Sequence, residues 1–394
     1  MLETLQLLLL LLVTVSWIYW LVAWWLTHRF FRSRPRAPAD YTPPVSLLKP
    51  IRGLDAQALA NFASFCQQHY SEYELLFGFA DTNDPGIAVA RQLQREHPEL
   101  TIRLVTGPVL GPNRKASLLH HLVASAQYDI LVISDSDMRV TPDYLRRVVA
   151  PLEHPATGLV TCCYRGENAK TLPAGLEALY IGTCFLPSVI IANQIFKFGF
   201  AMGSTAALRR SDLARLGGFR SIAEYLADDY QLGARITDLG LRVHLSDYVV
   251  ATVLGATSFR ELWHRETRWN RCARVSRPWC YPGLFITFST PLALLYILLS
   301  GLAPIGWGML AVSVAVRWLA SALISASTGD VVSRRWLLWL PVRDVMTSLA
   351  WLAGGLGRLI VWRGDRFILR SDGRMEPAPS TRTDWLREFM AWRP

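Results

Sequence analysis

Aspartates that follow two separate apolar runs are the first residues in this sequence that could do chemistry. The stretch "LVISDSDMRV" (131–140) carries Asp135 and Asp137, and "YELLFGFA" (73–80) is followed directly by Asp81. A single aspartate after a strand is usually a turn residue or a helix cap. Because ligands of open α/β sheets sit at the carboxyl ends of the strands, we expect these three carboxylates to share one edge and form a site.

Asp135 and Asp137 form a D-x-D pattern whose side chains point to the same side if the segment is extended. Two carboxylates suit Mg²⁺ or Mn²⁺, which would neutralise a diphosphate leaving group. D-x-D is frequent by chance, and a polar turn is the competing interpretation. Lys115, in "GPNRKASLL", stands where a Gly/Pro loop enters a helix, so it either pairs with a phosphate or extends to solvent. Asp84, close to Asp81, is interpreted as a loop residue.

Two further stretches carry groups that could complete such a site. In "YLADDYQLG" (225–233), Asp228 and Asp229 open a helix, where they either cap it or supply a general base for an acceptor hydroxyl. In "SFRELWHRETRWNRCARVSRPW" (258–279), Arg265, Arg268 and Trp269 share one helix face. We expect most arginines of this basic helix to lie on anionic lipid. The R-x-x-R-W element would close over the site, with guanidinium groups on a diphosphate and the indole on a sugar or acceptor.

The elements that must position these residues form an α/β domain over 45–257. Strands are expected at 45–50, 73–80, 101–106 and 128–135, and they alternate with helices at 55–69, 86–97 and 115–126. This alternation predicts a parallel sheet covered by helices. The sequence has neither G-x-G-x-x-G after the first strand nor a P-loop motif, which argues against a dinucleotide oxidoreductase and a P-loop NTPase.

An uncharged apolar run over 5–26 precedes this domain and is long enough to cross a membrane. It is too long for a cleaved signal peptide, so 1–27 is predicted to be a signal anchor. Basic residues follow it in a Pro-rich linker over 28–44 and place that flank in the cytoplasm by the positive-inside rule. These residues are Arg29, Arg32, Arg34 and Arg36.

A second apolar zone, 283–362, follows the basic juxtamembrane helix over 258–282. Two spans are expected at 283–302 and 304–326, joined by a tight "APIG" turn. The stretch 337–362 is interrupted by "PVRD" (341–344), so only 345–362 is cleanly apolar, and it is a third span, a re-entrant segment or an interfacial helix. A full span would place the arginine-rich tail 363–394 outside, against the positive-inside rule, so the topology of this end stays open.

Composition agrees with an integral membrane protein in a reducing compartment. Hydrophobic residues make up 51% of the chain and charged residues 18%. The six cysteines show no metal-ligand spacing and fit a reduced cytoplasmic domain. The net charge of +10 could suggest nucleic acid. Because the arginines cluster beside apolar segments, we instead expect contact with an anionic lipid bilayer and no nucleic acid.

The ordered set of motifs resembles membrane glycosyltransferases of the ceramide glucosyltransferase family. The resemblance covers nearly the whole chain and implies a nucleotide-diphospho-sugar transferase (GT-A) domain between an N-terminal anchor and C-terminal transmembrane helices, in the cell membrane. It rests on six stretches: "LLKPIRGLD" (47–55), "ELLFGFADTNDP" (74–85), "SDSDMRVTPDYL" (134–145), "GSTAALRR" (203–210), "LADDYQLG" (226–233) and "RETRW" (265–269).

The resemblance implies a role for each matching residue. Asp81 would contact the uridine nucleotide, and Asp135 and Asp137 would hold the metal and the diphosphate. Asp229 would be the catalytic base beside Asp228, and the closing motif would be Arg265, Arg268 and Trp269. The implied reaction is inverting transfer from a UDP-sugar to a lipid hydroxyl.

One departure concerns the acceptor. Animal members of the family carry a His-Pro pair, associated with the lipid side, where this sequence has Phe185 and Leu186 in "GTCFLPSVIIAN" (182–193). "TCCYRG" (161–166) and "FLPS" (185–188) are more similar to bacterial members that transfer N-acetylglucosamine to bacteriohopanetetrol. Ceramide and bacteriohopanetetrol both stay open as acceptors.

Two other functions are compatible with part of the sequence. A processive polysaccharide synthase would carry Q-x-x-R-W, where this sequence has Arg265, and more spans for a conduit. A non-catalytic scaffold that binds acidic lipid would explain the basic helix but leave the aspartates without a role.

Overall fold

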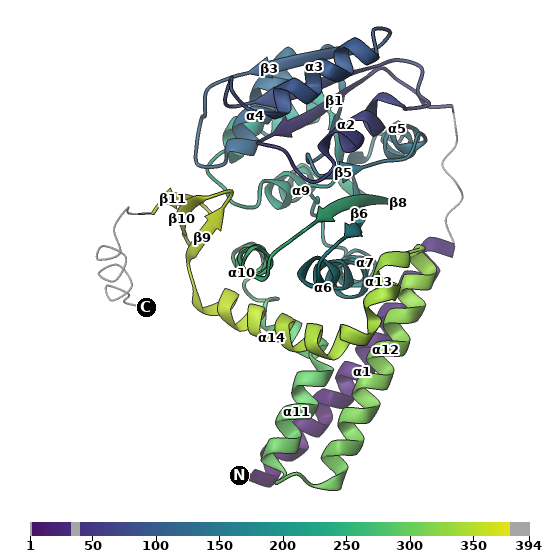
Figure 1. The fold of residues 1–394 in the computed structure, drawn as a ribbon, viewed down its shortest axis with the longest axis vertical. Coiled ribbons are helices and arrows are strands. Elements are labelled where there is room, and N and C mark those ends of the chain that lie inside the picture. Colours follow the sequence, from purple (N-terminus) through teal and green to yellow (C-terminus); the bar gives the residue numbers. More distant parts are fainter. Residues whose placement is uncertain (1, 33–39, 379–394) are drawn as a thin grey trace.

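An α/β head stands on a stalk of long apolar helices in the computed structural model, which describes residues 2–32 and 40–378 (Figure 1). The head holds an eight-stranded sheet with the strand order β3-β2-β1-β4-β7-β6-β8-β5. Four parallel strands form one half, as predicted: β1 (Val45–Ile51), β2 (Tyr73–Phe79), β3 (Thr101–Thr106) and β4 (Ile130–Ile133). The predicted helices between them are α2 (Ala58–Cys66), α3 (Gly86–Glu96) and α4 (Arg114–Ser125).

The apolar runs of these strands are continuous because both faces of the sheet are covered. Leu47 packs with the helices α2 and α3 on one face, whereas its neighbour Leu48 packs with α4 on the other. All seven residues of β1 are buried, including Lys49. The edge at which these strands end is therefore held rigidly from both sides.

The other half of the sheet is mixed, so the expectation of a purely parallel sheet was wrong there. Strand β7 (Ala206–Arg209) runs antiparallel between β4 and β6 (Thr157–Ala169), and β5 (Met138–Arg139) pairs antiparallel with β8 (Arg242–Gly255). Only β6 and β8 are parallel to each other. The strand–helix alternation that predicts parallel pairing stops after β4, since a long helical segment separates β6 from β7. That segment comprises α6 (Leu172–Tyr180), a π-helical turn (Ile181–Phe185) and α7 (Leu186–Gln194).

The stalk consists of α1 (Leu2–Arg32), α11 (Ser289–Leu299) and α12 (Pro304–Thr328), which run side by side (Figure 1). Among the described residues, three helices are long and apolar enough to cross a membrane, namely 2–32, 172–194 and 304–328. The second is 78% buried inside the protein and belongs to the head. The predicted span 283–302 is corrected: it is a 3₁₀ turn (Pro282–Thr287) and the 11-residue α11, whose length of about 17 Å is too short to cross alone.

The turn between α11 and α12 also differs from the expectation. Gly301 and Leu302 adopt positive φ angles of 64°, so the chain reverses before the "APIG" stretch. Pro304 is already in the first turn of α12, where its fixed φ and missing N–H favour helix initiation. This turn lies near the N-terminal end of α1, since Gln6 donates a hydrogen bond of 2.8 Å to the carbonyl of Leu299.

The stretch 337–362 does not run along the stalk beside α1 and α12. Helix α14 (Leu340–Leu356) lies across the end of the stalk and packs against α10 (Phe259–Ser276) and α6 (Figure 1). The two charged residues of "PVRD" explain this position of α14, because both are buried in ion pairs. Arg343 pairs with Glu266, and Asp344 pairs with Arg317. After α14 the chain returns to the head as a small sheet of β9 (Leu359–Trp362), β10 (Asp365–Leu369) and β11 (Met375–Pro377). Residues 363–378 therefore lie on the side of the head.

Candidate functional site

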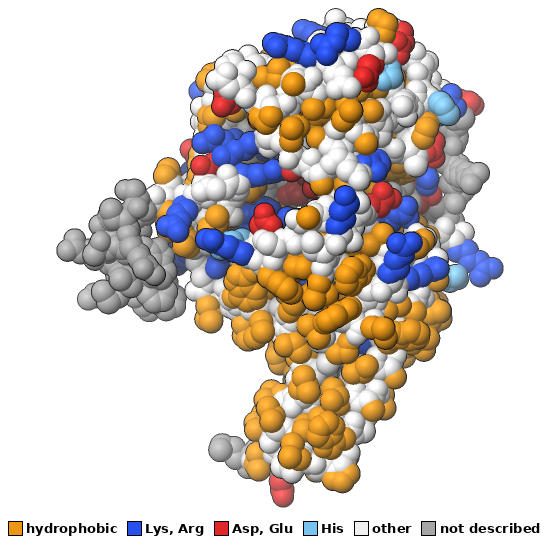
Figure 2. Space-filling model, in the orientation of Figure 1, with side chains coloured by type: hydrophobic (Ala, Val, Ile, Leu, Met, Phe, Trp, Pro, Cys, Tyr) orange, Lys and Arg blue, Asp and Glu red, His pale blue; other side chains and the backbone are white. Residues whose placement is uncertain are grey.

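A cavity of about 1340 Å³ lies between the carboxyl ends of the parallel strands and helix α10. Figure 2 shows the molecule hollowed at this level, with acidic and basic side chains around the opening, above the apolar band of the stalk. The structure brings all nine predicted site residues to this cavity: Asp81, Lys115, Asp135, Asp137, Asp228, Asp229, Arg265, Arg268 and Trp269.

The two aspartates after β2 differ in how they are used. Both oxygens of Asp84 accept backbone hydrogen bonds, from Gly86 N at 2.8 Å and Gly53 N at 2.7 Å, so it is the loop residue that the sequence suggested. Asp81 accepts one short local bond, from Asn83 N at 2.8 Å, and is exposed at the cavity wall. Asp81 is therefore the one of the two with an oxygen available to a ligand.

The D-x-D segment is a turn between β4 and β5. The expectation that its two side chains share one side because the segment is extended was therefore wrong. The backbone reverses at Ser136 and Asp137, and Met138 N donates to the carbonyl of Asp135 at 3.4 Å. The carbonyl of Asp135 also accepts a bond of 2.8 Å from the buried Lys49 Nζ. Both aspartate side chains nevertheless line the cavity. A rigid turn thus presents the two carboxylates that the extended segment was expected to present.

The electrostatics of this turn suit a divalent cation. Burial raises the pKa of Asp137 to about 6, and the carboxylates of Asp55 and Asp135 add to the shift. Crowded carboxylates of this kind gain from a bound cation, which removes their mutual repulsion. Among the described residues, no group of three or more His, Cys, Asp or Glu side chains is arranged to hold a metal. The protein would supply two carboxylates, and substrate phosphates and water would complete the shell, as is usual for Mg²⁺.

Lys115 links the D-x-D turn to the acidic pair. Its ammonium lies 2.6 Å from Asp135 Oδ1 and 3.5 Å from Asp228 Oδ2. Burial lowers the pKa of Lys115, but the carboxylates of Asp135, Asp228 and Asp229 raise it by more, so the side chain is held as a cation. It therefore does not extend to solvent, one of the two alternatives that the sequence left open, and its pairing with a phosphate stays a prediction.

Asp228 and Asp229 begin α9 (Asp228–Asp238). The N-cap residue Ala227 offers no side-chain cap, but Asp229 Oδ1 accepts a hydrogen bond of 2.7 Å from Tyr230 N in the first turn. Asp228 Oδ1 accepts from Asn113 Nδ2 at 3.1 Å. Asp229 Oδ2 accepts from Gly203 N at 2.9 Å. Burial, followed by repulsion from Asp228, raises the pKa of Asp229 to about 6. A carboxylate with that pKa is ionised at neutral pH and basic enough to accept a proton.

Gly203 is a site residue that no chemical pattern in the sequence identified. A Cβ atom at this position would lie 2.6 Å from Asp135 Oδ2 and 2.8 Å from Lys115 Nζ. Because the same backbone donates to Asp229, only a residue without a side chain fits where the two acidic motifs meet. In the sequence, only the family resemblance of "GSTAALRR" (203–210) draws attention to this glycine.

Helix α10 begins with a capping box of Ser258 and Glu261 and presents the R-x-x-R-W residues to the cavity. Arg265 pairs with the buried Glu177 at 2.5 Å, and Trp269 stacks on Tyr180 with ring centroids 6.2 Å apart. Arg268 lies over the ring of Trp362 at 5.4 Å. Within residues 2–32 and 40–378 it makes no hydrogen bond or ion pair. Arg268 is therefore a cation at the cavity wall that is ready for an anionic ligand.

Three further arginines of this basic stretch make contacts within the protein, and the expected contact of the stretch with lipid stays a prediction. Arg271 donates to the carbonyl of Leu359. Arg274 donates to the carbonyls of Gly355 and Gly357, at the end of α14. Arg277 lies over the ring of Phe198 at 4.2 Å. These residues fasten α10 to α14 and the head.

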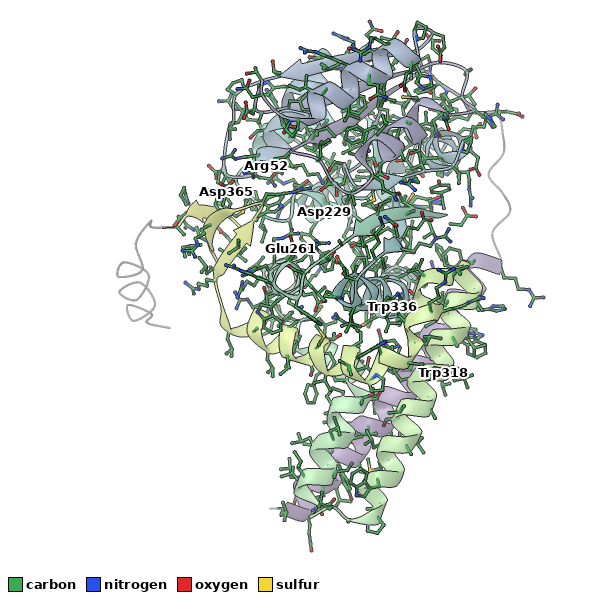
Figure 3. All side chains as sticks on the ribbon, viewed as in Figure 1. Arg52, Asp229, Glu261, Trp318, Trp336 and Asp365 are labelled. Atoms are coloured by element: carbon green, nitrogen blue, oxygen red, sulfur yellow. The ribbon has the colours of Figure 1, made fainter. Side chains whose placement is uncertain are left out.

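The small C-terminal sheet supplies a wall of the cavity that the sequence did not predict. Arg363, at the β9–β10 turn, makes hydrogen bonds of 2.9 and 3.1 Å to the two oxygens of Asp55. Asp365 pairs with Arg52 at 2.9 Å and lies 3.5 Å from Arg114. Figure 3 shows Arg52 and Asp365 close together where this sheet meets the head, with Asp229 deeper in the cavity. Residues far apart in sequence thus close one side of the site.

The end of the cavity nearest the stalk is apolar. Its lining includes Phe185, Val189, Phe200, Leu284 and Phe288. Phe185 belongs to the π-helical turn, an irregularity that is frequent at functional sites. Leu186 is fully buried in the core instead. One continuous cavity therefore joins an ionic end and an apolar end.

Comparisons with known proteins place this geometry in context. The model of the family described as Glycosyl transferase family 21 matches residues 8–375. Ceramide glucosyltransferase 3 of Caenorhabditis elegans is 25% identical over 369 residues, which cover 89% of this chain and 78% of that protein. Beta-monoglucosyldiacylglycerol synthase of Synechocystis is 24% identical over 280 residues, covering 64% of this chain and 55% of that protein.

A solved structure shows the fold. The mannosyltransferase PcManGT from Pyrobaculum calidifontis, in complex with GDP-Man and Mn²⁺, superimposes with a TM-score of 0.52 at 20% identity. The alignment covers 88% of this chain and 98% of that chain. The mixed α/β head therefore has the glycosyltransferase fold that the motifs led us to expect.

Proposed function

The chain belongs to glycosyl transferase family 21, and we propose that it moves one sugar from a UDP-sugar to the hydroxyl of a membrane lipid, with inversion at the sugar. The observation that carries this proposal is the continuity of the cavity, whose ionic end suits a nucleotide diphosphate and whose apolar end suits a lipid. The named relatives act on lipids by their descriptions, ceramide in one and a diacylglycerol in another.

We assign the donor to the ionic end. Asp81 would accept a hydrogen bond from the uridine nucleotide. Arg268 would contact the diphosphate, since it makes no hydrogen bond or ion pair with the described residues. A Mg²⁺ or Mn²⁺ ion held by Asp135 and Asp137 would neutralise the departing diphosphate. The similar mannosyltransferase was solved with GDP-Man and Mn²⁺, which supports a divalent ion in this role.

The transfer needs one base and one charged clamp. Asp229 would take the proton of the acceptor hydroxyl. The oxygen of that hydroxyl would form a bond to the anomeric carbon as the bond between the anomeric carbon and the diphosphate oxygen breaks. The diphosphate leaves as the anion, and Arg265 and Arg268 would stabilise its growing charge. Trp269, fixed by its stacking on Tyr180, would pack on the sugar or the acceptor. A single displacement from the opposite side inverts the anomeric centre.

The acceptor would enter from the membrane. The apolar end faces the stalk, so a lipid with a hydroxyl at its headgroup could present that group to Asp229 without leaving the bilayer. Ceramide and bacteriohopanetetrol both satisfy this requirement. Phe185, at the position where animal relatives carry the His of a His-Pro pair, lies at the apolar end and is therefore placed to distinguish the two.

The stalk would determine on which side of the membrane the head lies. We propose that α1 and α12 span the membrane and that the head is cytoplasmic, because Arg29 and Arg32 end α1 on the side of the head. Arg34 and Arg36 lie outside the described residues. Since α14 lies across the stalk and residues 363–378 return to the head, this arrangement agrees with the positive-inside rule. The expected location is the cell (inner) membrane.

A membrane-fraction assay tests the proposal. UDP-glucose and UDP-N-acetylglucosamine are crossed with ceramide, bacteriohopanetetrol and diacylglycerol, and the products are sized by mass spectrometry. We expect one donor–acceptor pair to give a monoglycosylated lipid, and excess chelator to remove that activity. A ladder of longer products would instead support a processive synthase, and the absence of product with every pair would contradict lipid glycosylation.

A further inference from the structure

A second cavity, of about 400 Å³, lies outside the catalytic one and shares no lining residue with it. It sits where the end of β6 meets α13 (Val331–Trp336) and the 3₁₀ turn Leu337–Trp339, directly after the membrane helix α12. Its lining consists of Asn168, Ala169, Val332, Arg335, Trp336 and Trp339. None of these residues has a role in the transfer reaction.

Two polar groups in this cavity lack partners. The amide Nδ2 of Asn168 is buried without a hydrogen-bond partner, a state that is costly unless a ligand or water supplies an acceptor. Arg335 is exposed and makes no ion pair or hydrogen bond within the described part of the chain. The nearby Asp330 cannot neutralise it, because that carboxylate is buried and bonded to Ser333 at 2.6 and 2.9 Å. The two donors are therefore open to an anion.

The walls of the cavity include two tryptophans and lie beside exposed apolar side chains. Trp336 is fixed against α6, since a Cβ on Gly175 would come within 2.2 Å of its ring, and Figure 3 shows it beside α6 and α13. In the same short segment Leu338 is 88% exposed and Trp339 is 41% exposed. Tryptophan and arginine beside exposed aliphatic side chains are typical of the membrane–water boundary. Figure 2 shows basic side chains at this level, where the apolar band meets the head.

We propose that this cavity binds the headgroup phosphate of one anionic phospholipid. Arg335 would make a charge-assisted hydrogen bond to a phosphate oxygen, and the Asn168 amide would donate to a second. The indole of Trp339 would lie at the glycerol level, and the acyl chains would run along Leu338 toward α12. The apolar surface continuous with the stalk favours a lipid over free phosphate. The site would anchor the α12–α14 connection and is independent of the transfer reaction.

Native mass spectrometry of the full chain in detergent tests this site, with titration by dioleoyl-phosphatidylglycerol or dioleoyl-phosphatidylcholine. We expect one tightly held phosphatidylglycerol per chain and a preference over phosphatidylcholine on the order of fivefold, the effect of one basic residue at a membrane surface. Arg335→Gln should remove the preference. Asn168→Asp should remove it too, because it replaces the buried donor by an anion, and Asp tolerates the left-handed φ of 54°.

Arg334→Gln is the matched control, because it removes the same charge from the same short helix. Arg334 donates to the carbonyl of Ser325 at 3.3 Å and does not line the cavity, so this variant should keep the preference. Equal losses in the two arginine variants, equal binding of both lipids, or displacement of the lipid by millimolar inorganic phosphate would each overturn the proposal. Retained transferase activity in all variants serves as the check of folding.

Discussion

Arg363 binds Asp55 through two hydrogen bonds of 2.9 and 3.1 Å, although 308 positions separate the two residues. The same carboxylate accepts a bond of 2.5 Å from Ser136, the middle residue of the D-S-D turn. Asp55 thus connects the β9–β10 turn of the C-terminal sheet to the turn that carries the proposed metal ligands, Asp135 and Asp137. The last described part of the chain belongs to the catalytic cavity as much as the first strands do.

Arg363→Gln is expected to weaken donor binding. The change removes the cationic partner of Asp55 and leaves that carboxylate uncompensated beside Asp137. The KM for the UDP-sugar should therefore rise about tenfold, as for the loss of a charged hydrogen bond. The KM for the lipid should not change. Steady-state kinetics with each substrate varied provide the measurement. Arg366→Gln, an exposed change in the same sheet, is the control, and an equal rise in both KM values would show general loosening instead.

Asp229→Asn is expected to lower kcat by about 10³-fold, since it removes the proposed base while keeping the shape of the side chain. The folded protein should be at least as stable as the parent, because the raised pKa means that burial of the ionised Asp229 destabilises the fold at neutral pH. Thermal unfolding and turnover are measured together. Asp238→Asn, exposed at the other end of α9, should leave both unchanged. Turnover that survives Asp229→Asn would rule out the base assignment.

The pH dependence of kcat/KM should report the raised pKa values of Asp229, the proposed base, and of Asp137, a proposed metal ligand. The base must be ionised, and the pKa of Asp229 is about 6. Activity should therefore be full near pH 7.5 and fall as the pH drops through about 6, approaching tenfold per unit. If the pKa of the base were that of a free aspartate, activity would fall only near pH 4. A fall only at that lower pH would contradict the raised pKa.

Gly203→Ala tests the meeting point of the acidic motifs. The added methyl group would lie against Asp135 and Lys115, so one of them must move and the D-x-D turn loses its position. We expect kcat/KM to fall by about 10²-fold, the usual effect of a small misplacement in an active site, with little loss of stability. Gly218→Ala offers a contrast: space there is open but φ is +65°, so stability should fall while the kinetics stay normal. The reverse pattern would refute this role for Gly203.

Glu266→Gln tests how α14 holds the closing helix. Glu266 follows Arg265 in α10 and pairs through both oxygens with the buried Arg343. Removing its charge leaves a buried guanidinium uncompensated, which typically costs about 3–5 kcal/mol of stability. Denaturant unfolding of the detergent-solubilised chain measures the loss. The double variant Glu266→Gln/Arg343→Met should recover much of it, and a double variant as unstable as the single would exclude the pair as the cause.

Much of the candidate site follows from local sequence signals. Strands of continuous apolar residues end at one edge of a sheet, and this rule alone brings Asp81 to the same edge as Asp135 and Asp137. Helical spacing likewise placed Arg265, Arg268 and Trp269 on one face of α10. These signals succeed because strand ends and helix faces depend on residues only a few positions apart.

Contacts between residues far apart in the sequence decided the position of 337–362 and the wall of the cavity that the C-terminal sheet forms. The position of 337–362 depended on buried partners for Arg343 and Asp344, and these lie on α10 and α12. The wall formed by Arg363 depended on its contact with Asp55, which lies 308 positions away in the sequence. The sequence by itself determined the first four strands, the helices between them and the acidic motifs. Only the tertiary structure decided which charges meet, because the cost of burying a charge is settled by partners that no local pattern records.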